Sequence, residues 1–298
     1  MLQASAVAQG SMVAIVTPMF EDGRLDIPSL NALIEFHIAQ GSDGIVIVGT
    51  TGESPTVDFD EHCLLIKTAV EQVRGRVSVI AGTGANSTKE AIALTQKAKD
   101  LGVDACLLVA PYYNKPTQEG LYQHFMAIAD AVAIPQILYN VPGRTGCDIS
   151  NDTVLRLAQH SNIIGIKEAS CIIEQCMEIA FHKPEDFLLI SGDDVQAVPI
   201  ISIGGVGVMS VIANAFPRQF TDMIHAALAG DYKTAQKALA AFLTIDPYLY
   251  EEGNPVGVKK ILALQGMIQG QVRMPLAEGS EALGNKLKEI ITQVKLSN

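Results

Sequence analysis

The chain has 298 residues, of which 48% are hydrophobic, so it is long enough for two average domains or one large barrel with a sizeable core. Its net charge of −11 argues against nucleic acid or an anionic membrane as a partner. No apolar run reaches the ~20 residues needed to span a bilayer. Residues Met1 to Gly10 lack the cationic start and apolar stretch of a signal peptide.

The cysteines and histidines do not indicate a metal centre. Five cysteines are scattered without a CxxC pair or zinc spacing, and six histidines form no HxH or HExxH motif. An odd number of scattered cysteines suits a reducing compartment. We therefore expect a cytoplasmic protein without a metal or cofactor, and a metal-dependent aldolase or hydrolase is disfavoured.

Eight short apolar runs alternate with stretches of helical pattern. Runs that are apolar on both faces are typical of parallel strands covered by helices. Eight strand–helix alternations predict an α/β fold of the (β/α)8 barrel type. An open doubly wound sheet is the alternative, but no GxGxxG motif follows the first strand. The predicted strands are Met12–Thr17, Gly44–Gly49, Val77–Gly82, Ala105–Ala110, Gln136–Asn140, Ile163–Lys167, Phe187–Ser191 and Val206–Ile212.

The segments between the strands carry helix signals. Asp58 precedes an apolar 3–4 spacing that ends at Gly75, and Ser87 and Glu90 have the spacing of a capping box. After Gly230 the strand pattern stops. We therefore divide the chain into a catalytic barrel, residues 1–230, and a helical C-terminal region, residues 231–298. Helices are predicted in that region over Tyr232–Leu243, Lys259–Ile268 and Ser280–Leu296, the last with Ser280 as N-cap.

Lys167 is the residue that most strongly suggests chemistry. It follows the apolar run Ile163–Ile166 and precedes Glu168. Catalytic groups of such barrels collect where strands end. Burial of an ammonium is costly, which favours a neutral amine that can attack a carbonyl and form a Schiff base. A lysine that reaches solvent or pairs with Glu168 is the alternative.

The second predicted strand ends in a motif suited to an anion. Thr50 and Thr51 lie between Gly49 and Gly52, and successive backbone N–H groups with two hydroxyls can hold a carboxylate. A tight turn stabilised by local bonding is the alternative. The motif is not a phosphate P-loop, because no Lys-Ser/Thr pair follows the second glycine.

Tyrosines and an arginine lie at the ends of the fourth and fifth strands. Tyr112 and Tyr113 follow the fourth strand, and Tyr139 ends the fifth. A tyrosine there acts as a proton shuttle or packs with its hydroxyl exposed. Arg144 lies in a loop framed by proline and glycine, where it serves as a carboxylate clamp or remains solvated. Together with Lys167, these strand ends predict a basin for a carbonyl substrate captured as an imine.

In this order, the motifs resemble those of the dihydrodipicolinate synthase family, the pyruvate-dependent class I aldolases. The resemblance covers nearly the whole chain and rests on residues 49–53, 111–114, 139–146, 165–168 and 191–194. It implies a (β/α)8 barrel with a helical C-terminal region. It also implies a homotetramer built as a dimer of dimers.

The resemblance also implies catalytic roles. Lys167 matches the lysine that forms the Schiff base with pyruvate, and Tyr139 matches the phenol that transfers protons. Thr50 and Tyr113 match the other members of its hydrogen-bonded relay. In the family, the tyrosine at the Tyr113 position reaches into the active site of the neighbouring subunit.

Four further residues match substrate-binding positions. Thr51 matches the residue that holds the pyruvate carboxylate, and Arg144 the residue that receives the carboxylate of the second substrate. Met209 matches an apolar residue against pyruvate, and Gly192 belongs to the same set. The paired threonines and the arginine loop are most similar to the synthase branch.

That branch condenses pyruvate with L-aspartate 4-semialdehyde to 4-hydroxy-tetrahydrodipicolinate in lysine and diaminopimelate biosynthesis. Sialic acid and keto-sugar-acid lyases share the lysine and the tyrosine and are the alternative within the family. A non-catalytic barrel that binds small acids as a sensor is the alternative outside it, since fold alone does not prove function.

Feedback inhibition by lysine is also implied. In inhibited family members, lysine binds at the tight dimer interface. Phe59 stands where well-studied inhibited members carry histidine, and Pro55 where they carry alanine, so we expect weaker inhibition. As alternatives, Glu90 is the N3 residue of the capping box and His62 lies on a helix surface. The residues that match the lysine site are Ser54, His62, Asn86, Glu90 and Tyr112.

Overall fold

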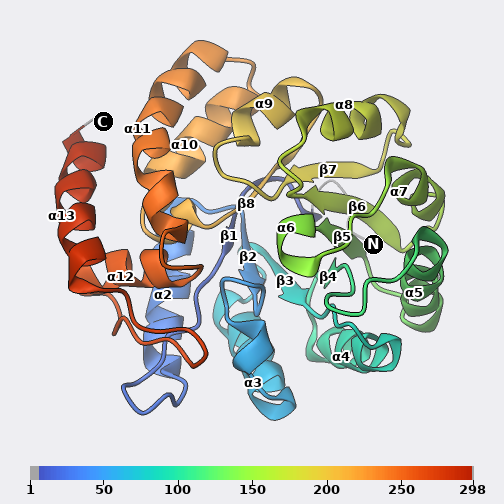
Figure 1. The fold of residues 1–298 in the computed structure, drawn as a ribbon, viewed down its shortest axis with the longest axis horizontal. Helices are drawn as coiled ribbons and strands as arrows, with labels where there is room; N and C mark the ends of the chain where they lie inside the picture. The colour runs from blue at the N-terminus through green and yellow to red at the C-terminus, as the bar shows by residue number, and fades with distance from the viewer. Residues whose placement is uncertain (1–6, 297–298) are drawn as a thin grey trace.

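The computed structural model of the protein describes residues 7–296, and its eight strands form a closed parallel barrel (Figure 1). Each strand pairs with the next along the chain, and β1 closes the barrel on β8. The predicted (β/α)8 fold is confirmed. Residues 1–6 and 297–298, at the ends of the two predicted regions, lie outside the described residues. The strands are β1 Gly10–Ala14, β2 Gly44–Ile47, β3 Ser78–Gly82, β4 Ala105–Val109, β5 Gln136–Asn140, β6 Ile163–Glu168, β7 Leu188–Ser191 and β8 Gly207–Ser210.

Four strands, β1, β2, β4 and β8, end earlier than predicted, and after β1 and β8 the next backbone N–H groups donate to side chains instead. The backbone N–H of Val16 donates to Asn214 Oδ1 at 3.0 Å, just after β1. The N–H groups of Val211 and Ile212 donate to Asp194 Oδ2 at 3.1 and 3.0 Å, just after β8. These donors are lost to the strand ladders. The apolar runs continue past these points, so the sequence pattern alone does not reveal where the strands stop.

Helices surround the barrel on its outer face (Figure 1). Asp58 caps α3 in a reciprocal capping box with Glu61. Ser87 caps α4 by accepting from Glu90 N at 3.4 Å, but no return bond to the Glu90 carboxylate is present within residues 7–296, so the predicted capping box is half formed. None of the described helices is long and apolar enough to cross a membrane. The helices up to Leu228 are α2 Ile27–Gln40, η1 Ser54–Thr56, α3 Phe59–Val73, α4 Thr88–Leu101, α5 Gln118–Ala131, α6 Pro142–Thr145, α7 Asn151–Leu157, α8 Ile173–His182, α9 Ala197–Ser202, η2 Ile212–Asn214 and α10 Pro217–Leu228.

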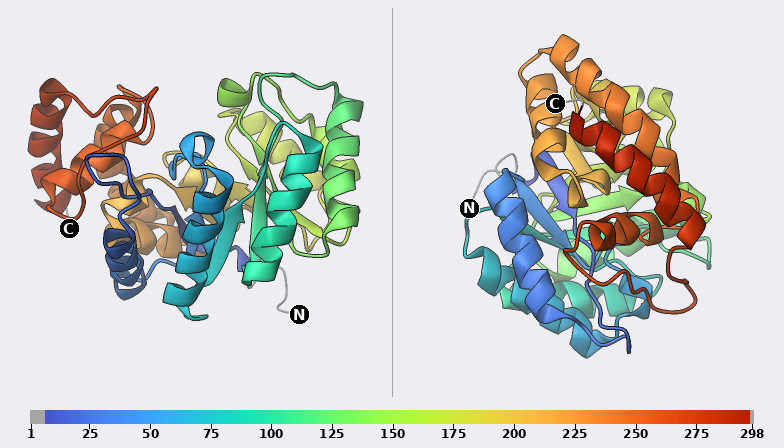
Figure 2. Two further views of the ribbon diagram at one scale, coloured as in Figure 1. Left: turned by 90° about the horizontal axis from the view of Figure 1, so that it is seen from below. Right: turned by 90° about the vertical axis from the view of Figure 1, so that its left-hand side faces the viewer.

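The last three helices lie together at one side of the barrel (Figure 2). They are α11 Tyr232–Tyr250, α12 Val256–Leu264 and α13 Glu281–Leu296. Ser280 Oγ accepts from Leu283 N at 3.1 Å, which confirms it as the N-cap of α13. The first helix runs seven residues beyond its predicted end at Leu243, through Pro247. The second begins three residues before Lys259, so that this lysine lies inside the helix.

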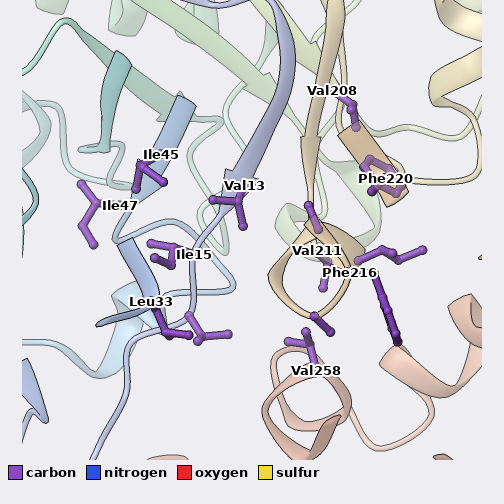
Figure 3. Packing of buried hydrophobic residues seen from close by; sticks show 14 of the residues in the cluster. Val13, Ile15, Leu33, Ile45, Ile47, Val208, Val211, Phe216, Phe220 and Val258 are labelled. Atoms are coloured by element: carbon purple, nitrogen blue, oxygen red, sulfur yellow. The ribbon is translucent and has the colours of Figure 1, made fainter. Parts of the chain in front are cut away.

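The C-terminal helices share the hydrophobic core of the barrel. The rings of Phe220 in α10 and Phe242 in α11 lie 5.2 Å apart, edge to face. Val258 of α12 belongs to the same buried cluster as Val211 and Phe216 near the end of β8 (Figure 3). The C-terminal helices are therefore packed onto the barrel wall next to β1 and β8.

Candidate active site

Lys167 and Tyr139 face each other inside the barrel. They are paired in register at the ends of β6 and β5, so their side chains point to the same side of the sheet. Both are buried, with exposed fractions of 6% and 7%. The Lys167 Nζ atom lies 4.2 Å from the centre of the Tyr139 ring. An amine and a phenol therefore share one wall of the barrel interior.

The neighbouring residues on the same two strands point to the opposite side. Asn140 Nδ2 donates to Glu168 Oε2 at 3.0 Å and to Asp148 Oδ1 at 2.6 Å. Burial raises the pKa of the Glu168 carboxyl above its usual range. Among the described residues Lys167 forms no ion pair, so the alternative in which it pairs with Glu168 is wrong.

Gly192 lies against the Lys167 side chain, and Met209 shares a buried apolar cluster with Tyr139. A Cβ atom at Gly192 would lie 2.7 Å from the Ala169 Cβ and 3.1 Å from the Lys167 Cε. Any larger residue at position 192 would come too close to the Lys167 side chain in its present position. Met209, buried in β8, belongs to the same apolar cluster as Tyr139. Met209 and Tyr139 therefore lie in the same apolar surroundings.

Thr50 and Thr51 come from the tight loop after β2. Thr50 and Tyr139 line one small cavity of about 30 Å³. The N–H groups of Gly52 and Ser54 both donate to Gly49 O, at 3.0 and 3.3 Å. These donors are therefore not free for an anion, which corrects the broader expectation for this loop. Within the described part of the chain, the N–H groups of Thr50 and Thr51 have no protein acceptor.

Tyr113 is not brought into this basin by its own chain. Its side chain is 90% exposed, and its backbone has a positive φ of 73°. Arg144 is also exposed, on the short helix α6 that directly follows Tyr139. The arginine forms no ion pair within residues 7–296. The single chain therefore brings together Lys167, Tyr139 and the Thr50 loop and presents Tyr113 to the outside.

The predicted lysine-site residues gather around a second cavity of about 100 Å³. Its lining includes Ser54, His62, Glu90 and Tyr112, together with Pro55 and Phe59. Asn86 adjoins it, since its Nδ2 donates to the Tyr112 carbonyl at 3.1 Å.

His62 and Tyr112 in this second cavity have altered acidities. His62 is 6% exposed and contacts Gly82 O through Nε2 at 2.7 Å, so its placement on a helix surface is wrong. Burial lowers the pKa of His62, which keeps the imidazole neutral. Burial and the nearby Glu90 carboxylate raise the pKa of Tyr112. The cavity therefore offers one exposed carboxylate, at Glu90, beside neutral polar groups.

A match to known proteins decides the family. The chain matches the model of the Dihydrodipicolinate synthetase family over residues 7–294. The chain belongs to this family. A relative from Nitrosospira multiformis, named 4-hydroxy-tetrahydrodipicolinate synthase, is 56% identical over 285 residues, which cover 96% of this chain and 95% of the relative.

Solved structures of the family superpose on nearly the whole chain. The chloride-inhibited dihydrodipicolinate synthase from Acinetobacter baumannii, complexed with pyruvate, is 46% identical with a TM-score of 0.95, covering 96% of this chain and 99% of that one. The enzyme from Cyanidioschyzon merolae with lysine bound is 36% identical with a TM-score of 0.94, covering 97% and 98%.

Sequence reasoning missed a set of residues behind the Thr50–Thr51 loop of this family member. Lys259 of α12 is fully buried and pairs with Glu53 at 2.5 Å. Burial lowers the pKa of the Lys259 ammonium, although the Glu53 carboxylate opposes that shift. Asn254 and Arg273 contact the same loop. The available signal was a lysine within the apolar run Val256–Leu264, where a charge needs a buried partner.

Proposed function

We propose that this protein is a 4-hydroxy-tetrahydrodipicolinate synthase, a lyase that joins pyruvate to L-aspartate 4-semialdehyde in the route to diaminopimelate and lysine. The observation that carries the proposal is the buried Lys167 amine 4.2 Å from the Tyr139 ring, in a chain 56% identical to a relative of that name. A buried amine beside a phenol combines a nucleophile with a proton donor.

In the first half of the reaction, the Lys167 amine attacks the keto carbon of pyruvate. The carbinolamine then loses water to become an imine, and loss of a methyl proton gives the nucleophilic enamine. Tyr139 carries protons in these steps, with Thr50 and the Tyr113 of a second subunit completing the relay. The adjacency of the Lys167 amine and the Tyr139 ring on one wall of the barrel supports this assignment.

The pyruvate carboxylate is bound by the loop after β2. The free N–H groups of Thr50 and Thr51 and the Thr51 hydroxyl are donors for its oxygens. Gly192 and Met209 bound the space for the three-carbon unit beside the lysine. This subsite binds a small acid whose keto group faces the amine.

In the second half, the enamine carbon attacks the aldehyde carbon of aspartate semialdehyde and forms the new carbon–carbon bond. The amino group of that substrate then attacks the imine carbon, which releases Lys167 as the free amine and closes the ring. Arg144 binds the carboxylate of the semialdehyde through two N–H groups. Its exposed position on α6 leaves the guanidinium free to meet a substrate that enters from solvent.

A homotetramer, a dimer of dimers, fits the exposed apolar side chains. Phe59, Tyr112 and Tyr113 are exposed by 49%, 38% and 90% near the start of α3 and the end of β4. A second apolar group on α8, Met177 and Phe181, is exposed by 40% and 77%. Helices α3 and α8 lie on different sides of the barrel (Figure 1). The two groups of exposed apolar side chains can therefore each contact a different copy of the chain.

The division of the chain at Gly230 and a cytoplasmic location also belong to the proposal. Gly230 has a positive φ of 81° and separates the last barrel helix from α11, which supports a boundary between residues 1–230 and 231–298.

All five cysteines are free thiols, as suits a reducing compartment.

We further infer that lysine inhibits the enzyme from the cavity beside Tyr112. The Glu90 carboxylate suits the ammonium groups of lysine, and a related structure contains lysine. Phe59 replaces a polar contact with an apolar ring, so inhibition should be weak. The test is the condensation rate over rising lysine concentration, for the native chain and for Glu90→Ala. A flat rate through millimolar lysine in the native chain would contradict this inference.

The main experiment is condensation of pyruvate with aspartate semialdehyde, coupled to a nicotinamide-dependent reductase that consumes the product. Turnover at ordinary enzyme rates is expected. Borohydride treatment with pyruvate should also leave a covalent adduct on Lys167. An adduct without turnover would point to a sugar-acid lyase, and no adduct at all would point to a sensor barrel.

A further inference from the structure

The loop that carries Thr50 and Thr51 is held by the C-terminal part of the same chain. Asn254 Nδ2 donates to Thr51 Oγ1 at 3.1 Å, across 203 residues of sequence. Both side chains are buried, with exposed fractions of 8% and 2%. The bond therefore lies out of reach of competing water.

This bond determines where the Thr51 hydroxyl proton can point. A hydroxyl oxygen that accepts from an amide keeps its own proton for another acceptor. Among residues 7–296, no protein acceptor takes that proton. The Asn254 Oδ1 atom is itself buried without a partner among the described residues.

A buried ion pair holds the next part of the loop. Lys259 Nζ donates to Glu53 Oε1 at 2.5 Å and to the carbonyl of Gln271 at 2.6 Å. Glu53 Oε2 accepts from the backbone N–H of Arg273 at 2.9 Å. Glu53 has a positive φ of 59°, an unfavourable conformation for a side chain of its kind. The ion pair therefore stabilises a strained turn two residues after Thr51.

Arg273 extends the attachment to the far end of the loop. Its guanidinium donates to both Glu61 oxygens at 2.6 Å and to the carbonyl of Thr56 at 2.7 Å. The loop is thus held at Thr51, Glu53 and Thr56 by a segment that begins more than 190 residues later.

We propose that Asn254 and Lys259 are positioning residues for the reaction: Asn254 directs the Thr51 hydroxyl proton toward the substrate carboxylate, and Lys259 fixes the loop through Glu53. The inference rests on the proposed function, in which Thr51 binds pyruvate. The C-terminal helices then serve the pyruvate subsite directly, beyond covering the barrel. A purely structural contact would change unfolding temperature without changing pyruvate affinity.

The first experiment measures the pyruvate concentration for half-maximal borohydride trapping, and KM and kcat in the condensation. For Asn254→Ala we expect this concentration and KM for pyruvate to rise about 3- to 10-fold, as for a lost hydrogen bond. For Asn254→Asp we expect a rise of about 100-fold, because the carboxylate takes the Thr51 proton and repels the substrate carboxylate. The value of kcat should change less than KM. Asn31→Ala, in α2, is the matched control.

A double-mutant cycle tests whether Asn254 acts through Thr51. Thr51→Val alone should raise KM for pyruvate, and adding Asn254→Ala to it should cause no further rise. Independent, additive effects would overturn the role given to Asn254. So would unchanged pyruvate KM and trapping in both single variants of Asn254.

Lys259 needs a charge-balanced design because removing one partner leaves the other charge buried. The double variant Lys259→Met with Glu53→Gln removes both charges. We expect the double variant to fold. Its KM for pyruvate should be several-fold higher than that of the native chain. Lys286→Met is the control, since it breaks an exposed pair with Glu251 in the same C-terminal region. A double variant with native pyruvate KM would overturn the role of Lys259.

Trapping separates the failure of this inference from the failure of the proposed function. If the native protein traps pyruvate but does not use aspartate semialdehyde, only the second substrate is wrong, and the trapping curves still test Asn254. If the native protein traps no pyruvate, both the proposed function and this inference are overturned.

Discussion

The loops after β2 and after β4 show two ways of building one site. Both contain a residue with positive φ, Glu53 at 59° and Tyr113 at 73°. The first is compensated by a buried ion pair from the same chain, since Lys259 is fully buried against Glu53. The second carries a side chain that is 90% exposed and meets its own chain through a backbone bond from Tyr113 N to Thr145 O. Strained backbone persists where surrounding contacts support it. One loop is therefore completed by folding, and the other by association, as we propose.

The largest effect should come from Lys167, which lies in the part completed by folding. Lys167→Ala removes the proposed nucleophile, and we expect the condensation rate to fall by about 10⁴-fold or more. Circular dichroism and the melting temperature should stay close to native. Lys233→Ala, an exposed lysine of α11, is the control. A variant that keeps a measurable fraction of native turnover would remove Lys167 from the mechanism.

Tyr113 tests the part completed by association. Tyr113→Phe should reduce turnover by about 10²-fold, as for the loss of one proton-transfer group. If Tyr113→Phe and Lys167→Ala proteins are dissociated, mixed and reassembled, activity should return. Each mixed pair then contains one site with an intact lysine and an intact tyrosine from different chains. Should the mixture stay inactive while the pairs form, Tyr113 does not act in the neighbouring site.

Arg144 lies between the two cases, because its own chain positions its backbone but leaves its side chain exposed. Arg144→Ala should raise KM for aspartate semialdehyde about 10- to 100-fold, the range for charge-assisted bonds to a carboxylate. Half-maximal borohydride trapping of pyruvate should not move. Arg156→Ala, which breaks an exposed pair with Glu119, provides the comparison. Equal effects on both substrates would contradict the assignment.

The smallest effect concerns Asp194, which holds the end of β8 from inside the fold. Burial raises the pKa of this carboxyl from 3.8 to about 6. As pH rises, the Asp194 carboxyl loses its proton at a lower pH in the unfolded state than in the folded state. The free energy of unfolding therefore falls as pH rises from about 4 to about 6. The native chain should lose a few degrees of melting temperature across this pH range, and Asp194→Asn should lose less. Parallel melting curves for the native chain and the variant would show that Asp194 does not titrate there.

Local sequence patterns predicted the strands and their order because each strand is an apolar run between turn signals. These patterns did not predict the strand ends that are set by hydrogen bonds to residues far away in the sequence. Strand β1 stops early because the backbone N–H of Val16 donates to Asn214, some 200 residues away. The burial of His62 was not predicted, because a position on a helix does not reveal what covers the side chain; its ring lies against the Gly82 carbonyl. These outcomes depend on contacts that no short window of sequence contains.

By itself, the sequence predicted the barrel, a lysine and a tyrosine at neighbouring strand ends, and the resemblance to the family. Each of these depends on short motifs whose spacing follows from the strand and helix period. Only the tertiary structure decided that Thr51 receives a bond from Asn254 and that Lys259 pairs with Glu53, across more than 200 residues. The physical reason is that a buried polar group must find a partner wherever the closed barrel places one. Chain folding then supplies that partner from the helices farthest along the sequence.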